Sequence, residues 1–236
     1  MNIFVSPNYI NMNAFSLENI FTFLVNLDRN NNREWFAVNK SQYEQAKSEF
    51  AEYVTLIGKE IEKIDSKFNF SHAKDYTFRI YRDVRFSHNK SPYKNNFGAF
   101  FSIGGRKSPY AGYYLHIQPG ASFFGGGIYR PEKEILNAVR QEVYYSYKEF
   151  RKVLDNKEFK KVYPELLGDK LVNGPKDFPK DCEAIDLLKY KSIVVSHAVS
   201  ESELKDKSFS KHLLHGFELL LPLNQLLNTA IELKSN

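Results

Sequence analysis

The stretch FGAFFSIGGRKSPYAGYYLHIQPGASFFGGGIYRPE, residues 97–132, decides the fold. Aromatic and β-branched residues fill three short blocks, 97–103, 112–118 and 121–129, and Gly-Gly, Ser-Pro and Pro-Gly turn signals separate them. Blocks of this kind, joined by short turns, are typical of consecutive antiparallel strands. The stretch therefore predicts an antiparallel β-meander.

Two further segments have the pattern of strands in the same sheet. Residues 76–86 lie just before the meander, with aromatic and aliphatic residues alternating with charged ones. Residues 191–199, KSIVVSHAV, form a later β-branched run. With these additions the sequence predicts a meander of about four to five strands.

Helical periodicity flanks the strands on both sides, with apolar residues recurring at three- and four-residue steps. The region 35–64 fits either one long helix or a broken pair, and Pro222 is expected to interrupt the last helix. The predicted helical regions are 16–27, 35–64, 131–163 and 209–233. We expect an α+β fold in which N-terminal and C-terminal helices pack against the antiparallel sheet.

The composition restricts the class of protein. The chain has 236 residues, 42% of them hydrophobic and 26% charged, and no repeat or biased linker divides it, so one domain over 1–236 is expected. No apolar run approaches the roughly 20 residues that span a bilayer, and the start, MNIFVSP, lacks the pattern of a leader. We therefore expect no membrane partner and a cytoplasmic location. The single thiol, Cys182, excludes an internal disulfide and a cysteine-based zinc site.

Positive charge is concentrated in one segment. The chain carries a formal net charge of +5, while residues 79–107 hold seven basic residues and one acid. The rest of the chain is therefore close to neutral, which indicates a local cationic element rather than a uniformly basic coat. A solvated face is the simplest interpretation of such a run, but the interleaved aromatic residues tie this segment to the core.

Alternation predicts that polar side chains of two strands converge on one face of the sheet. Tyr114, His116 and Gln118 share one side of the strand 112–118, and Arg79 and Arg85 share one side of 76–86. The predicted ligand-binding residues are Arg79, Arg82, Asp83, Arg85, Lys90, Lys94 and Gln118, and the predicted catalytic residues are His116 and Tyr114. Asp83 is expected to orient the arginines, and nearby cations should favour the neutral form of His116, which could then act as a base. Simple packing of this histidine and an internal salt-bridge ladder are the alternatives.

Other candidate chemistries are weaker. The run Gly125–Gly127 before Pro131 looks like a phosphate loop, but it matches neither a P-loop nor a dinucleotide motif, and close strand packing explains it better. His212, His215 and Glu218 follow at three-residue steps on the last helix, yet the leucine stripe places the histidines on its solvent side or edge. We therefore expect no metal site, and the sequence leaves any cofactor unknown.

Four strings resemble one family: NNREWFAVNKSQYE from 31, FRIYRDVRFSHNKSPYKNNFG from 78, GYYLHIQPGASFFGGGIYRPE from 112 and LLPLNQLLNTA from 220. They are similar to the conserved hypothetical proteins grouped as domain of unknown function 2461, over about residues 15–233. The resemblance implies one intact domain, and it brings no activity, substrate or cofactor with it.

Three functional hypotheses follow from these patterns. The first is a basic pocket, lined by tyrosine and histidine, that binds a small ligand bearing phosphate or carboxylate, and it leaves open whether the site is enzymatic. The second is a nucleic-acid-binding module that uses the same basic, aromatic face. The third is a structural or adaptor domain in which the arginines hold strands together. The oligomeric state is not fixed by the sequence.

Overall fold

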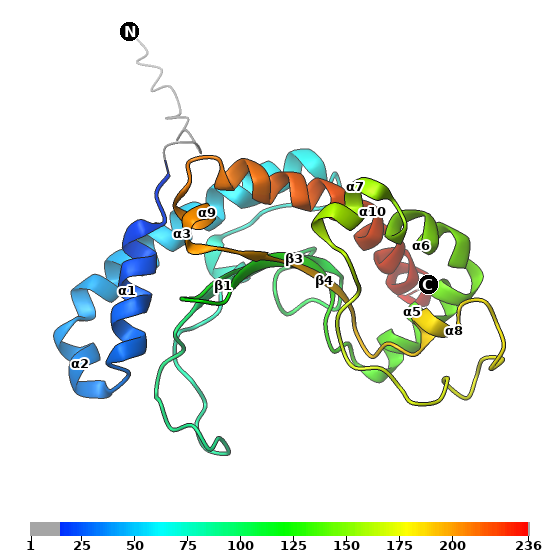
Figure 1. Cartoon of the computed structure of the whole chain (residues 1–236), viewed down its shortest axis with the longest axis horizontal. Coiled ribbons are helices and arrows are strands. Elements are labelled where there is room, and N and C mark those ends of the chain that lie inside the picture. The colour runs from blue at the N-terminus through cyan, green and yellow to red at the C-terminus, as the bar shows by residue number, and fades with distance from the viewer. Residues whose placement is uncertain (1–14, 236) are drawn as a thin grey trace, which may run out of the picture.

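A four-stranded antiparallel sheet lies at the centre of the computed structural model, which describes residues 15–235. Its strands follow the spatial order β1-β2-β3-β4 (Figure 1). They are β1 (Phe97–Ser102), β2 (Gly112–Ile117), β3 (Ser122–Ile128) and β4 (Ile193–Val199). The predicted α+β fold with an antiparallel meander is confirmed, whereas the start that carried the leader expectation, residues 1–7, lies outside the described residues.

The predicted strand over 76–86 is wrong. Only two isolated bridges form there, between Thr77 and Ala99 and between Tyr81 and Tyr93. Ile80 is 1% exposed but Phe86 is 94% exposed, so the alternation does not follow one buried face. The backbone N–H of Arg85 donates to the side chain of Asp83, and local bonds of this kind compete with a strand ladder.

Helices cover one face of the sheet and flank its ends. The described residues contain α1 (Glu18–Arg29), α2 (Arg33–Val38), α3 (Lys40–Ile64), α4 (Ala73–Tyr76), α5 (Lys133–Tyr145), α6 (Tyr147–Leu154), α7 (Lys157–Val162), α8 (Ile185–Leu188), α9 (Glu201–Lys205) and α10 (Phe209–Ser235). The long N-terminal pattern is thus a broken pair, because Asn39 ends α2 and begins α3.

Pro222 does not interrupt α10, which runs from Phe209 to Ser235. A proline removes one backbone donor and displaces the carbonyl four residues earlier, here that of Glu218. Glu218 is exposed, so water can satisfy this carbonyl, while the neighbouring Leu220 and Leu223 are fully buried. Packing on both sides of the proline therefore keeps the helix continuous, contrary to the prediction.

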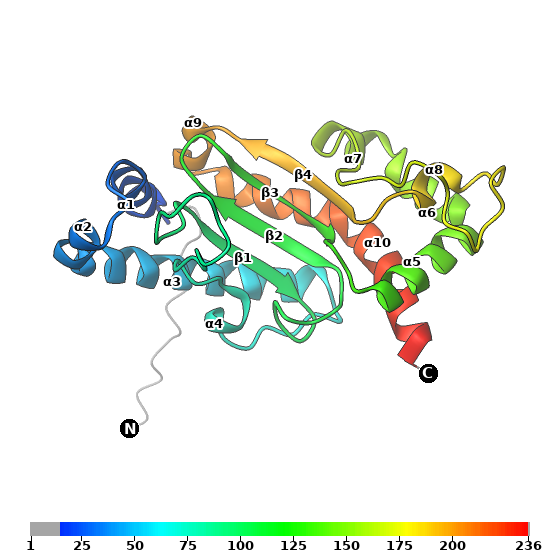
Figure 2. The ribbon, with the colours of Figure 1, turned by 90° about the horizontal axis from the view of Figure 1, so that it is seen from below.

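The sheet has one covered and one open face. Phe101, Tyr113 and Phe124 point to the covered side, where their rings meet Phe217 of α10. Figure 1 shows α3 and α10 crossing this side, and the sheet arches so that its other face is concave. Figure 2 looks onto the concave face, with α3 and α10 behind the strands. The concave face is the one that α3 and α10 leave uncovered.

The glycine run of β3 is explained by packing. A side chain at Gly125 would overlap the Val195 carbonyl of β4, and one at Gly126 would overlap the Gly112 carbonyl of β2 and Leu220 of α10. Glycine at these positions lets β3 lie between its neighbours and directly under α10. This agrees with the packing interpretation of the sequence.

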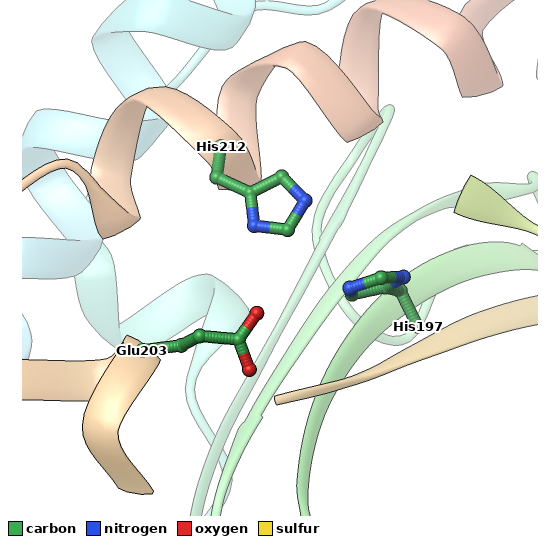
Figure 3. Close-up of side chains that lie close together, drawn as sticks. All are labelled: His197, Glu203 and His212. Carbon is green, nitrogen blue, oxygen red and sulfur yellow. The ribbon is translucent and has the colours of Figure 1, made fainter. Parts of the chain in front are cut away.

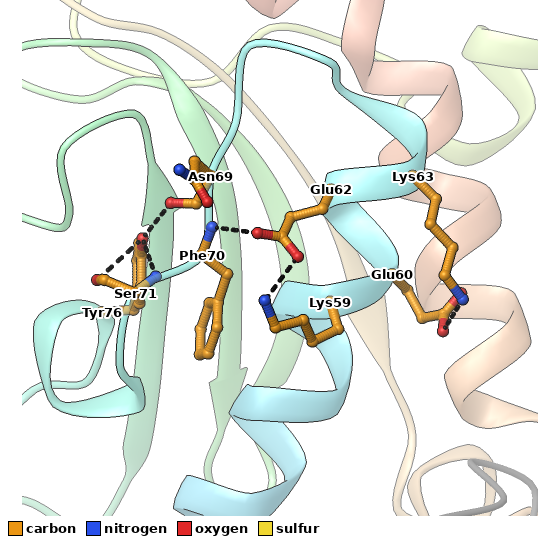
Figure 4. Close-up of polar contacts among 8 residues, drawn as sticks. All are labelled: Lys59, Glu60, Glu62, Lys63, Asn69, Phe70, Ser71 and Tyr76. Atoms are coloured by element: carbon orange, nitrogen blue, oxygen red, sulfur yellow. Dashed lines mark hydrogen bonds and ion pairs between the residues drawn. The ribbon is translucent and has the colours of Figure 1, made fainter. Parts of the chain in front are cut away.

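The end of α3 fixes the segment that leads to the concave face. Glu62 accepts a hydrogen bond from the Phe70 backbone N–H at 2.7 Å and pairs with Lys59 at 2.8 Å (Figure 4). The Lys59 ammonium holds the pKa of Glu62 below its usual value. The Tyr76 hydroxyl donates to the Asn69 carbonyl at 3.1 Å, and the Phe70 ring lies against Gly58. These contacts hold residues 69–76 in place, so residue 77 starts from a defined point beside β1.

Among the described residues, no helix is long and apolar enough to cross a membrane.

Candidate anion-binding site on the concave face

Three polar side chains of β2 and its end form a hydrogen-bonded row on the concave face. The Tyr114 hydroxyl lies 3.0 Å from His116 Nδ1, and His116 Nε2 lies 2.8 Å from Gln118 Oε1. Because the Gln118 oxygen can only accept, Nε2 carries the proton and Nδ1 accepts from Tyr114. The three residues share one face, as alternation predicted, and their contacts hold His116 in its neutral Nε2–H form.

Aromatic rings enclose this row. Phe123 of β3 stacks on His116 with ring centroids 4.7 Å apart, and Phe78 meets the Tyr114 ring edge-on at 6.2 Å. Gly98 of β1 lies under the Tyr114 hydroxyl, since a Cβ there would be 2.7 Å from that oxygen. Burial raises the pKa of Tyr114 to about 12, so this hydroxyl remains a hydrogen-bond donor at neutral pH.

One cation, Lys94, lies near the row, and a second, Arg79, lies close enough to Lys94 to affect its pKa. Lys94 is half-buried, with its Nζ 5.7 Å from the centre of the Phe78 ring. Burial, followed by the charge of Arg79, lowers the pKa of Lys94. Within residues 15–235, the side chains of Lys94 and Arg79 have neither a hydrogen bond nor a carboxylate within 4.0 Å. The fold thus places two neighbouring positive charges without a direct counter-charge.

Electrostatics link Lys94 to His116. Burial lowers the pKa of His116 below its ordinary value, the hydrogen bond with Gln118 raises it, and the charge of Lys94 lowers it further. The predicted neutral histidine is therefore what this environment favours, although desolvation is its main cause rather than the cations.

Backbone contacts place Lys94 at the site. The Lys94 N–H donates to the Ile80 carbonyl at 2.7 Å, and the neighbouring residue Tyr93 exchanges two hydrogen bonds with the side chain of Asn31, at 3.0 and 3.1 Å. Tyr93 also stacks on Phe36 of α2, with centroids 3.9 Å apart. Sequence reasoning missed Asn31, because no local pattern links it to a residue 62 positions later.

The remaining predicted residues are engaged within the loop 82–90. Arg85 makes a two-bonded ion pair with Asp83, at 2.9 and 2.7 Å, and both side chains are exposed. Arg82 donates to the Ser87 hydroxyl at 3.3 Å, and Lys90 donates to the Val84 carbonyl at 3.1 Å. Asp83 thus orients Arg85 directly and reaches Arg79 only through longer-range attraction. In the part of the chain described, none of these loop residues bonds to His116.

One cavity lies away from the concave face. It has a volume of about 490 Å³ between α6, α7 and α10, lined by Val153, Phe159, Leu219, Pro222 and Leu226 together with polar residues at its rim. It contains none of the predicted site residues. We base the candidate site on the concave face because the perturbed histidine, lysine and tyrosine cluster there.

Acidification is expected to destabilise the protein as the pH falls from about 7 to below 6.5, the ordinary pKa of histidine. The pKa of His116 is lower in the folded state than its ordinary 6.5, so the unfolded chain takes up this proton first. The stability that neutral His116 contributes is present above the unfolded pKa and is lost as the pH falls toward the folded pKa. His212 shifts in the same direction. Melting temperatures across this range should fall less steeply in His116→Gln than in the wild type, and equal slopes would contradict the assignment.

Comparisons with known proteins give one result. A family model described as conserved hypothetical protein (DUF2461) matches residues 19–226. No curated protein and no solved structure matches the chain.

Proposed function

The chain belongs to the DUF2461 family of conserved hypothetical proteins, and since that description names no activity, we propose a function from the geometry of the concave face. The face binds a small ligand through a phosphate or carboxylate group, which lies between Lys94 and Arg79 and against the Tyr114–His116 row. The observation that carries the proposal is the half-buried Lys94, which has a neighbouring cation but, among residues 15–235, no carboxylate partner.

Charge balance favours an anion at this point. Burying a charge costs free energy unless a counter-charge or hydrogen bonds replace the lost water. Lys94 bears this cost and also the repulsion of Arg79, both of which lower its pKa. A bound phosphate or carboxylate would offset both unfavourable effects and would accept hydrogen bonds from the ammonium and guanidinium groups.

The neighbouring groups suit recognition and proton transfer. In a catalytic form of the proposal the ligand's proton passes through Tyr114, whose hydroxyl accepts it while donating its own proton to Nδ1 of His116, the base. Lys94 and Arg79 would meet negative charge that develops on a phosphate ester or acyl substrate. Phe123 and Phe78 supply apolar surface for the rest of the ligand.

A short oligonucleotide is the competing ligand. The strands arch around this face in Figure 1, and its aromatic rings could stack bases. We favour a small anion because the unpaired charge is concentrated at Lys94 and Arg79, whereas Arg82, Arg85 and Lys90 are engaged within their own loop. The structural alternative rests on the Asp83–Arg85 pair, which is exposed and therefore worth little free energy.

Two lysine variants test the proposal. Lys94→Gln and Lys90→Gln remove the same charge from the same segment, but only Lys94 belongs to the site. Thermal shift and calorimetry are run with inorganic phosphate, nucleotides, sugar phosphates, carboxylates and a short oligonucleotide, at two salt concentrations. We expect a small anion to raise the melting temperature of the wild type and of Lys90→Gln, and Lys94→Gln to lose about tenfold or more in affinity.

The other outcomes separate the alternatives. A response to the oligonucleotide alone, weakened equally by both substitutions and abolished by salt, would establish nucleic-acid binding instead. If none of these ligands raised the melting temperature and Lys94→Gln were destabilised, a structural role would be established, because the proposal requires this variant to keep its stability. Product analysis with a ligand that binds then decides whether the site turns it over.

A further inference from the structure

A second polar cluster lies on the covered side of the sheet, where β4 passes under the start of α10. It consists of His197 from β4, Glu203 from α9 and His212 from α10 (Figure 3). One ligand atom of each residue lies within 4.8 Å of the others. In Figure 3 the carboxylate and the two imidazoles point into one shared space.

Hydrogen bonds to residues outside the cluster orient two of these three side chains. His197 Nδ1 lies 3.1 Å from the Val162 carbonyl, so Nδ1 carries the proton and the Nε2 lone pair is left free. Glu203 Oε2 accepts hydrogen bonds from the N–H and hydroxyl of Ser200, at 2.8 and 2.6 Å, as part of a capping box. Among residues 15–235, no hydrogen bond occupies Oε1 of Glu203. Backbone carbonyls and hydroxyls that hold ligands in this way are typical of protein metal sites.

An apolar wall supports the same cluster. The Phe124 ring contacts His197 at 5.0 Å and His212 at 5.4 Å between centroids, and the two imidazoles meet edge-on at 4.9 Å. Burial and the proximity of His197 lower the pKa of His212, which favours the neutral imidazole that a metal requires.

We propose that His197, Glu203 and His212 bind a divalent transition-metal ion of the zinc class. Two imidazole nitrogens and one carboxylate oxygen are ligands that Zn²⁺ prefers, and water would complete four-fold coordination. Bonds of about 2.0–2.2 Å set ligand atoms roughly 3.3–3.5 Å apart in a tetrahedron. Small rotations of the three side chains would therefore close the site, and the ion would link β4, α9 and α10.

This site differs from the metal face considered in the sequence. That face combined His212 with His215 and Glu218, and the leucine stripe of the helix argued against a metal site there. The structure turns His212 toward β4, while His215 is exposed and pairs with Glu218 at 3.6 Å. The proposed ligands all lie between residues 197 and 212, so they come together through one strand-to-helix connection.

The test uses the full chain with any purification tag removed, because a polyhistidine tag binds the same ions. After treatment with a chelator, Zn²⁺ and, as a control, Mg²⁺ are titrated in thermal shift and calorimetry. At about 100 times its dissociation constant, Zn²⁺ is expected to raise the melting temperature by roughly 5–10 °C, and Mg²⁺ should have little effect. Co²⁺ should give the intense visible bands of four-coordinate cobalt.

Three variants make the result specific. His212→Ala removes a ligand, and Glu203→Gln removes the carboxylate charge while glutamine still fits a capping box. His215→Ala, one turn further along α10, is the matched control. We expect Zn²⁺ affinity to fall at least tenfold in the first two variants and to stay unchanged in His215→Ala. A wild type without a Zn²⁺ response, or a response that persists in His212→Ala, would overturn the proposal.

Discussion

Replacing Phe217 by alanine is expected to lower the free energy of unfolding by about 3–5 kcal/mol, the largest effect of any single change considered. Phe217 is fully buried in α10, and its ring contacts those of Phe101, Tyr113 and Phe124 on three different strands. The truncation removes apolar contact and leaves a cavity that the rigid strands cannot fill. The sheet and α10 would therefore lose the side chain through which three strands contact the helix.

Urea denaturation followed by circular dichroism measures this loss. Leu233→Ala, in the same helix but 64% exposed, is the control and should change stability by no more than about 0.5 kcal/mol. A Phe217→Ala midpoint close to that of Leu233→Ala would show that α10 is not held to the sheet at this point.

The Gly126→Ala substitution is expected to cost about 3 kcal/mol, which corresponds to a decrease in melting temperature of roughly 6–12 °C. The added methyl group would overlap the Gly112 carbonyl of β2 and the Leu220 side chain of α10. Leu220 could change rotamer, but the carbonyl belongs to the hydrogen-bonded sheet. Strands β2 and β3 would have to separate locally to admit the methyl group.

Gly120→Ala is the matched control for this clash. Gly120 has a φ of +72°, and nothing lies within 4 Å of the position of a Cβ there. Alanine at 120 therefore tests backbone strain alone and should cost about 1 kcal/mol. If thermal unfolding gave equal losses for the two variants, steric overlap in β3 would not be the cause.

The sequence was sufficient for the repetitive parts of the fold. Alternation and turn signals located β1, β2, β3 and β4, because each strand has a partner along most of its length. The segment 76–86 has equally good alternation, but bonds within its own loop replace a full ladder. Pro222 was misjudged for a related reason, since the packing of distant residues, not local propensity, decides whether α10 continues.

In the candidate site, too, sequence reasoning located the residues that follow a regular pattern and missed those that do not. Period-two alternation was enough to place Tyr114, His116 and Gln118 together, since they lie on one strand and its end. The local engagement of loop 82–90 and the anchoring of Tyr93 by Asn31 depend on the path of an irregular segment. The cluster around His212 was missed because its members lie on a strand and two helices whose relative positions no periodicity encodes.

Both outer strands of the sheet have part of their free edge occupied. Beside β1, the Phe78 N–H donates to the Gly98 carbonyl at 3.1 Å, and beside β4, the Leu167 N–H donates to the Val194 carbonyl at 2.8 Å. An exposed strand edge is a template for pairing with another chain and so for aggregation. Here an incoming strand would first have to displace one of these segments. These segments therefore oppose edge-to-edge polymerisation of the sheet.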